Sequence, residues 1–273
     1  SRRNDFGAER KSSIALCAQL YGSSDRYGDD DRTATVFGTD LTFSDRLKTK
    51  RRGAQVDLGF RAGSAFTVGL TAGYAHATSD LRSTTDADIE GYNIGAFAQF
   101  GSATGFYAGL MAKRDTYDVR FANQPFISMV EVDAKSSGVD GEVGWRTTSF
   151  GPMLDVNAGL SYVSTDMDDF IAGNIAFDND DWTSTRGRIG ARLGWSGSLA
   201  PYVGGTLFHE FGDEDEITVR SGTLIDTIER RGRGTWARLE AGLGGGAGGG
   251  PLLSVWTDLG DVKGWGLRAG FRF

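Results

Sequence analysis

Apolar residues recur at every second position along most of this chain, which is the period of a β-strand with two different faces. In the last ten residues, Trp265, Leu267, Ala269, Phe271 and Phe273 alternate with glycine and arginine. The same alternation recurs in the segments 66–74, 92–100, 139–146, 154–162 and 188–195. The pattern predicts an all-β protein whose strands present one apolar and one polar face.

Twelve strands account for the alternating runs and for the breaks between them. The predicted spans are 12–24, 48–61, 66–79, 88–101, 105–119, 133–148, 151–165, 182–196, 199–212, 229–243, 251–259 and 262–273. The connections at 62–65, 102–104, 149–150 and 197–198 are short, and those at 25–47, 120–132, 166–181 and 213–228 are long. Short turns at one rim and long loops at the other are typical of outer-membrane barrels. An even number of strands then brings both termini to the short-turn rim.

Aromatic residues mark two levels on the apolar face. Phe66 and Tyr74 are eight residues apart, as are Tyr92 and Phe100. Eight residues of strand span roughly 26 Å, which a tilt of about 40° reduces to roughly 20 Å of depth, close to the apolar band of about 25 Å between aromatic girdles. We therefore predict a transmembrane antiparallel β-barrel of about 12 strands. The competing soluble β-sandwich also alternates, but its strands are usually only about 5–6 residues long. Residues assigned to the level near the long loops are Tyr74, Tyr92, Tyr162, Trp182 and Trp265.

Composition narrows the choice of protein class. No run approaches 18 apolar residues, so a transmembrane helix is excluded, and the other backbone that can cross a bilayer is a closed barrel. Glycine contributes 41 of the 273 residues, about twice its usual share. The net charge of −7, without a dominant basic stripe, argues against nucleic-acid binding. The single cysteine, Cys17, permits no internal disulfide and matches no zinc spacing, so we expect no metal and no cofactor.

Charged residues on the polar face of the strands are expected to line the lumen. There they can pair with one another, whereas each cation would cost roughly 2–4 kcal/mol against lipid near the midplane. The interpretation is open between a network that holds the barrel open and a surface that passes or grips a polypeptide. The facing of the strands at 199–212, 229–243 and 251–259 stays open, because their alternation is weakest. The candidate lumen residues are Asp57, Arg61, Asp140, Glu142, Arg146, Asp155, Arg188, Arg192, Arg238, Glu240, Arg268 and Arg272.

Catalytic chemistry has little support in the sequence. The two histidines are His76 and His209, and His209 precedes an acidic run at 213–216. No serine and histidine stand at a supporting spacing, and solvated loop charges explain the acidic run. We therefore predict that the chain is not an enzyme.

The order of these features resembles the autotransporter translocator domain, over nearly the whole chain from Ser12 to Phe273. Three segments carry the resemblance most sharply: GWGLRAGFRF at the C-terminus, PYVGGTLFHEFG at 201–212 and GVDGEVGWR at 138–146. A terminal phenylalanine in an alternating strand is typical of outer-membrane barrels in general, and the run of twelve spacings is what points to this family. The last strand also resembles the signal read by the barrel-assembly machinery, with Gly266, Phe271 and Phe273 as its expected residues.

The resemblance implies a bacterial outer-membrane location, a helix inside the lumen, and secretion and surface anchoring of an N-terminal passenger. The implied partners are outer-membrane lipid, lipopolysaccharide, the barrel-assembly machinery and the chain's own passenger. Residues 1–11 are expected to be a linker or the remnant of the lumenal helix, which could enter the lumen, and residues 12–273 the barrel domain. Eleven residues of helix span about 16 Å, too little to cross a hydrocarbon core of about 30 Å. The alternative is a stand-alone outer-membrane channel or structural barrel without a passenger.

Overall fold

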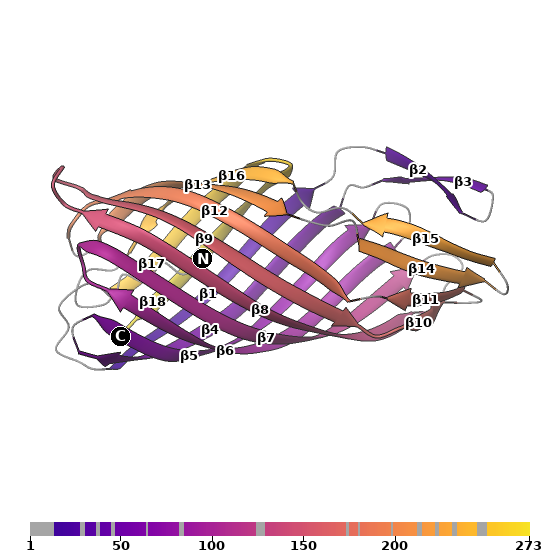
Figure 1. Cartoon of the computed structure of the whole chain (residues 1–273), viewed down its shortest axis with the longest axis horizontal. Coiled ribbons are helices and arrows are strands. Elements are labelled where there is room, and N and C mark those ends of the chain that lie inside the picture. Colours follow the sequence, from indigo (N-terminus) through magenta and orange to yellow (C-terminus); the bar gives the residue numbers. More distant parts are fainter. Residues whose placement is uncertain are drawn as a thin grey trace.

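The computed structural model describes residues 14–27, 31–36, 39–44, 47–63, 65–81, 85–123, 129–172, 175–179, 181–197, 199–211, 215–221, 224–230, 234–244 and 250–273. These residues form strands and turns (Figure 1). No helix in this part of the chain is long and apolar enough to cross a membrane.

Twelve antiparallel strands close into one barrel, in which each strand pairs with its neighbours in sequence order and β18 pairs back onto β1 (Figure 1). The closed barrel of twelve strands confirms the predicted fold class. The barrel strands are β1 (Ile14–Tyr27), β4 (Leu47–Ala62), β5 (Phe66–Leu81), β6 (Thr85–Gly101), β7 (Gly105–Asn123), β8 (Val130–Thr147), β9 (Met153–Met167), β12 (Trp182–Gly194), β13 (Pro201–Phe211), β16 (Thr235–Leu243), β17 (Gly250–Gly260) and β18 (Val262–Arg272).

Both ends of the barrel sequence meet at the rim of short turns. Ile14 is in register with Phe60 at the end of β4, and the backbone N–H of Phe273 donates to the carbonyl of Leu16 at 2.9 Å. Two turns at this rim contain Gly63 and Gly151 at φ of 74° and 89°, a left-handed conformation that costs glycine little. The strand that opens the barrel therefore starts at this rim and runs toward the other one.

The opposite rim carries six further strands that the sequence pattern did not predict. A hairpin of β2 (Asp31–Val36) and β3 (Thr39–Ser44) follows β1, and a four-stranded sheet combines β10 (Phe170–Ala172), β11 (Ile175–Asn179), β14 (Asp215–Ser221) and β15 (Leu224–Arg230) from two loops. The predicted strand at 229–243 was partly wrong, because residues 229–230 belong to β15 and the barrel strand starts at Thr235. Strands of three to seven residues are too short to show a periodicity, and their partners lie in distant loops.

The two faces of the wall differ sharply in exposure. On the outer face, Leu70 is 57% exposed and Ile94 is 65% exposed, whereas the inner-face Thr71 is only 2% exposed. The same alternation settles the facing of β13, β16 and β17, where Leu207 and Leu239 are exposed while Trp236 is buried. A continuous apolar surface thus covers the outside of a closed sheet, which is the arrangement that contact with hydrocarbon requires.

Glycines on the inner face lie directly opposite aromatic residues of the neighbouring strand. A Cβ on Gly144 would come within 2.4 Å of the Tyr107 ring, and one on Gly266 within 2.0 Å of the Trp256 ring. The rings therefore lie against the wall where the opposing residue has no side chain, a known way to stabilise a glycine in a sheet. This packing explains part of the glycine excess. The six pairs are Tyr21 with Gly53, Phe97 with Gly69, Tyr117 with Gly91, Tyr107 with Gly144, Tyr202 with Gly242 and Trp256 with Gly266.

The barrel lumen as candidate functional site

The residues predicted to line the lumen all alternate with outward-facing apolar residues and are shielded from bulk solvent. Seven of the twelve meet in three clusters on the inner wall, which involve Arg146 with Asp155, Arg188 with Asp140 and Glu142, and Arg192 and Arg238 with aromatic or acidic neighbours. Buried members are Asp57, Arg146, Asp155, Arg188, Arg192 and Arg272. Half-buried members are Arg61, Asp140, Glu142, Arg238, Glu240 and Arg268.

Asp155 is the centre of the first cluster and is 0% exposed. Its carboxylate accepts a hydrogen bond from Arg146 Nε at 2.9 Å and another from the Tyr107 hydroxyl at 2.8 Å. The guanidinium of Arg146 also lies 4.1 Å from the centroid of the Tyr107 ring. The cluster ties β7, β8 and β9 together with a charge pair that is buried against the lumen wall.

Arg188 forms the second cluster by reaching along the wall past an entire strand. From β12 its guanidinium donates to Asp140 at 2.6 and 2.9 Å and to Glu142 at 3.1 Å, both on β8. The intervening strand β9 places Gly159 beneath it, where a Cβ would come within 2.6 Å of the guanidinium carbon. This glycine lets the side chain lie flat on the wall instead of crossing the lumen.

The third cluster alternates arginines with aromatic rings from β12 to β18. Arg238 makes two hydrogen bonds to Asp258, at 2.7 and 2.8 Å, and also lies 5.1 Å from the Trp256 ring. Arg192 lies 4.6 Å from the ring of Tyr202. Arginine stacks readily on aromatic faces, so the rings hold the guanidinium groups against the wall. The sequence pattern did not identify Asp258, Tyr202 or Trp256 as lumen residues. Asp258 could have been identified, because it lies on the same face of its strand as Ser254 and Trp256, at alternate positions.

The inner faces of β5 and β6 contrast with these clusters. The described inward residues of the two strands carry no charge, and are mainly glycine, alanine and threonine, with one each of Ser, Ile, Asn, Gln and Phe. We call this stretch the uncharged arc, and the inner face of β12, β13, β16, β17 and β18 the arginine arc. The lumen wall is thus electrostatically lopsided.

The C-terminal strand carries the three residues predicted to be an assembly signal. Gly266 is buried opposite Trp256. The rings of Phe271 and Phe273 are 4.8 Å apart at their centroids and exposed on the outer face, at the short-turn end.

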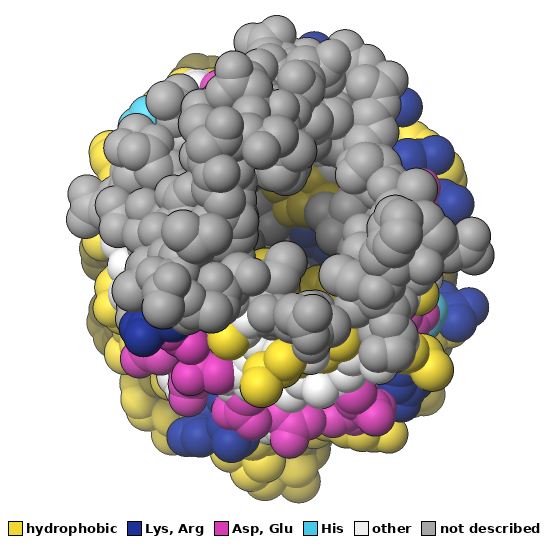
Figure 2. Space-filling view, turned by 90° about the vertical axis from the view of Figure 1, so that its right-hand side faces the viewer, with side chains coloured by type: hydrophobic (Ala, Val, Ile, Leu, Met, Phe, Trp, Pro, Cys, Tyr) yellow, Lys and Arg dark blue, Asp and Glu magenta, His cyan; other side chains and the backbone are white. Residues whose placement is uncertain are grey.

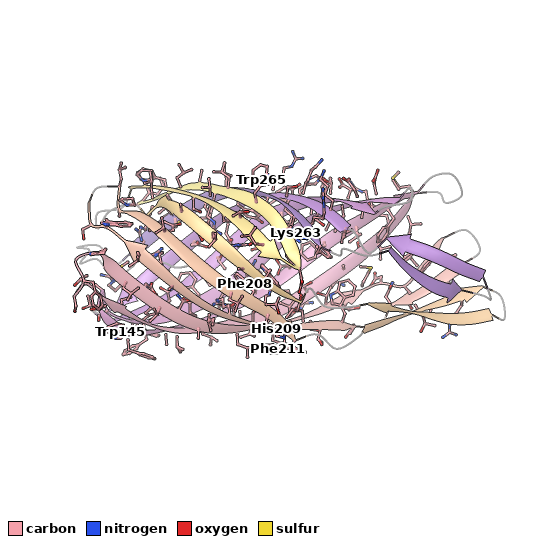
Figure 3. All side chains as sticks on the ribbon, turned by 90° about the horizontal axis from the view of Figure 1, so that it is seen from above. Trp145, Phe208, His209, Phe211, Lys263 and Trp265 are labelled. Atoms are coloured by element: carbon pink, nitrogen blue, oxygen red, sulfur yellow. The ribbon has the colours of Figure 1, made fainter. Side chains whose placement is uncertain are left out.

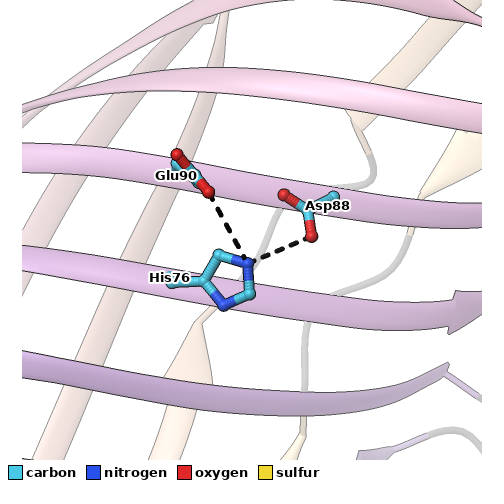
Figure 4. A group of neighbouring side chains, drawn as sticks. All are labelled: His76, Asp88 and Glu90. Carbon is cyan, nitrogen blue, oxygen red and sulfur yellow. Dashed lines mark hydrogen bonds and ion pairs between the residues drawn. The ribbon is translucent and has the colours of Figure 1, made fainter.

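One group in the described part of the chain has donors suited to a metal ion: His76, Asp88 and Glu90, on the outer face of β5 and β6 (Figure 4). His76 Nε2 is 3.0 Å from Asp88 and 3.9 Å from Glu90. Arg52 Nε donates to His76 Nδ1 at 3.2 Å, which requires the neutral imidazole to carry its proton on Nε2 and donate it to Asp88. A metal at Nε2 would displace that proton, so the contacts favour a hydrogen-bonded line across three strands.

His209, the catalytic candidate that the sequence did not support, lies on the outer face near the end of β13 (Figure 3). Its Nδ1 is 2.7 Å from the Thr235 hydroxyl, and its ring meets that of Phe211 edge-on at 4.6 Å. The acidic side chains at 213–216 lie outside the described residues. Within the described part, the contacts of His209 are those of a structural side chain.

The apolar exterior, the paired charges inside and the closed twelve-stranded sheet together define a bacterial outer-membrane β-barrel. The model of the family described as the autotransporter beta-domain matches residues 16–259. The chain therefore belongs to the autotransporter β-domain family and acts as an outer-membrane translocator domain. A search of curated proteins finds no significant match to the sequence.

Solved translocator domains share the fold. The translocator domain of the autotransporter NalP from Neisseria meningitidis is 14% identical with a TM-score of 0.72, over 98% of this chain and 91% of that one. The transport unit of AIDA-I from Escherichia coli is 15% identical with a TM-score of 0.66, over 97% and 90%. The β-domain of the Bordetella autotransporter BrkA is 15% identical with a TM-score of 0.63, over 96% and 99%. The predicted resemblance, location and translocator role are thus confirmed.

Proposed function

We propose that the lumen is the path by which the segment preceding β1 connects a surface-exposed passenger to the barrel. The observation that carries this proposal is the start of β1 at the short-turn rim. A passenger beyond the opposite rim is joined to Ile14 only through the interior, because lipid covers the outside and cannot satisfy an unpaired backbone. On this proposal residues 1–11 are a linker or the remnant of the lumenal helix, and residues 12–273 are the membrane domain.

The lopsided wall suits a polypeptide in transit. The uncharged arc offers no partner that would hold a charged side chain, and the arginines of the opposite arc already have acidic or aromatic neighbours. Charges that are paired within the wall bind a passing chain weakly. The twelve predicted lumen residues therefore act, in this proposal, by keeping the channel wet and open, which unites the two interpretations left open by the sequence.

Family membership favours this role over the alternative of a stand-alone channel. We further propose that the role is one of transport without catalysis, since the ring of His209 contacts a threonine and a phenylalanine.

Crosslinking can test the path directly. In a Cys17→Ser background, a secreted and epitope-tagged passenger is fused before Ser1, and Ser13→Cys is paired with either Met111→Cys or Leu110→Cys. Met111 and Leu110 are consecutive on β7 but face the lumen and the lipid, respectively. We expect surface display of the tag on intact cells, and a crosslink only with the cysteine at position 111.

A tag that stays in the periplasm while the barrel is inserted would contradict the secretion role. Surface display with crosslinking equal at positions 110 and 111 would contradict the lumenal path. Leu110→Cys is the matched control, because Leu110 is adjacent to Met111 in the sequence but its side chain lies on the opposite face of the barrel wall.

Two partners belong to the same proposal. We propose that the barrel-assembly machinery reads Gly266, Phe271 and Phe273, and that the outer face contacts lipopolysaccharide. The exposed rings of Phe271 and Phe273 at the short-turn rim support the first.

Deletion of Phe273 is expected to reduce insertion in cells severalfold while spontaneous folding into vesicles changes little. Heat-modifiable gel migration measures both. Normal insertion in cells would contradict the signal, and an equal loss in vesicles would show a folding defect instead.

A further inference from the structure

Three cations lie side by side on the outer face near the long-loop rim. Arg26 of β1 is in register with Lys263 of β18 on one side and with Lys48 of β4 on the other. All three follow the outward alternation of their strands. Side chains in register on one face have Cβ atoms roughly 4.5–5.5 Å apart, and like charges at that distance destabilise a sheet. The row therefore concentrates positive charge at one place on the outer face.

The row lies just above the aromatic belt. Lys263 is two residues beyond Trp265 on the same face, toward the rim that carries the added strands (Figure 3). On β4, Lys50 and Arg52 follow Lys48 toward the midplane at the next outward positions, and Arg52 is in register with His76, two residues beyond Tyr74. Five cations thus occupy the depth at which lipid headgroups meet the belt. We call Arg26, Lys48, Lys50, Arg52 and Lys263 the basic patch.

The three strands that carry the patch, β18, β1 and β4, have no acidic residue at their described outward positions. Within the described residues, no ion pair joins Arg26, Lys48 or Lys50 to an acid. The nearest outward acids lie on the next two strands, where Asp80 of β5 is in register with Lys48 and with Asp86 of β6. Elsewhere at this level charges are matched, as in the pair of Arg120 with Glu131 at 2.9 Å. Seen end-on, acidic and basic side chains are interspersed along the lower rim (Figure 2). The excess of positive charge is therefore local, in a chain whose net charge is −7.

We propose that the basic patch binds the phosphate groups of lipopolysaccharide in the outer leaflet. Arginine and lysine are the side chains that recognise phosphate, arginine by two parallel hydrogen bonds, and clusters of them beside a membrane surface bind anionic headgroups. The outward direction of the patch and its position directly above Trp265 point to a lipid ligand. The inference rests on the lipopolysaccharide contact proposed above and assigns that contact to the outer face of β18, β1 and β4.

Binding to purified lipid A tests the assignment. The protein in detergent micelles is titrated with diphosphorylated lipid A, with its dephosphorylated form, and with phosphatidylglycerol. The patch variant Arg26→Gln/Lys48→Gln/Lys263→Gln is compared with Arg114→Gln/Arg120→Gln/Lys135→Gln, which removes three outward cations from β7 and β8. At about one kcal/mol for each cation near an anionic surface, three substitutions should weaken binding at least tenfold.

We expect the patch variant to bind lipid A at least tenfold more weakly than the unchanged protein, and the control variant less than twofold more weakly. Dephosphorylated lipid A should not bind tightly to any of the three proteins. Equal losses in the two variants, or affinity independent of the phosphates, would overturn the proposal. Phosphatidylglycerol bound as tightly as lipid A would overturn the choice of ligand. Heat-modifiable migration verifies that the variants fold, and surface display of the fused passenger is measured separately, so failure of secretion and failure of lipid binding are distinguishable.

Discussion

The uncharged arc and the arginine arc solve the same problem, the filling of the inner wall of a barrel, in opposite ways. On β5 and β6 small residues such as Thr71 and Gly95 line most of the wall, and Phe97 over Gly69 is the one ring among their described inward residues. On the arginine arc, large side chains lie flat over glycines, and Trp256 over Gly266 is an example. Inward arginines then stack on these rings. A wall can therefore keep its lumen open either by having small side chains or by packing large ones sideways.

The largest expected effect separates the outer face from the inner face of the uncharged arc. Leu70→Arg or Ile94→Arg places a cation in lipid, and should cost roughly 2–4 kcal/mol near the midplane or prevent folding. The matched inner-face variant, Gln99→Arg on β6, should leave the free energy of unfolding nearly unchanged. Urea titration of the barrel in lipid vesicles measures all three. Equal costs on the two faces would contradict the assigned facing.

The charge clusters should be the next most sensitive. Asp155→Asn leaves Arg146 buried without its counter-charge, which typically costs about 3–5 kcal/mol in soluble proteins and less in a wet lumen. Glu131→Gln removes an exposed pair with Arg120 and should cost less than about 1 kcal/mol. The same unfolding titration compares them. If Asp155→Asn were as mild as Glu131→Gln, the cluster would not hold β7, β8 and β9 together.

Packing of rings over glycines should give a smaller effect. Gly266→Ala forces the Trp256 ring to move, and overpacking of this kind costs roughly 1–3 kcal/mol. Gly109→Ala is the control, since its Cβ would meet only Gln99 and a backbone oxygen, at 3.8 and 4.0 Å. Stability of the two variants in vesicles, and fluorescence of the tryptophans, would show the difference. An unchanged Gly266→Ala variant would mean that the ring is free to leave the wall.

The same contrast explains how much of the fold could be predicted from sequence. Alternation fixes the facing of β5 and β6, because their inward residues are mostly small or polar and their outward residues are apolar. On β13 and β16, the inward Phe208 and Trp236 are as apolar as the outward Leu207, so hydrophobicity alone cannot assign the faces. Trp182, predicted to belong to the aromatic belt, alternates in step with the inward Arg186 and Arg188.

The candidate site was predicted only in part, for a related reason. Charged residues on polar faces are visible in a sequence, but their partners are not. Arg188 and Asp140 are 48 positions apart in the sequence. Their side chains meet because β12 and β8 are the two neighbours of β9 in the barrel, so that Arg188 only has to reach across one strand. Likewise the His76 group and the basic patch depend on register between strands, which no local pattern reveals.

The central claim is that consecutive residues of a strand face lipid and lumen in turn. Spin labels at position 267 or position 268, in a Cys17→Ser background, test it with two collision reagents. We expect the label replacing Leu267 to be accessible mainly to oxygen dissolved in lipid, and the label replacing Arg268 mainly to a water-soluble nickel chelate. Equal accessibility at both positions, or the reverse order, would contradict the account.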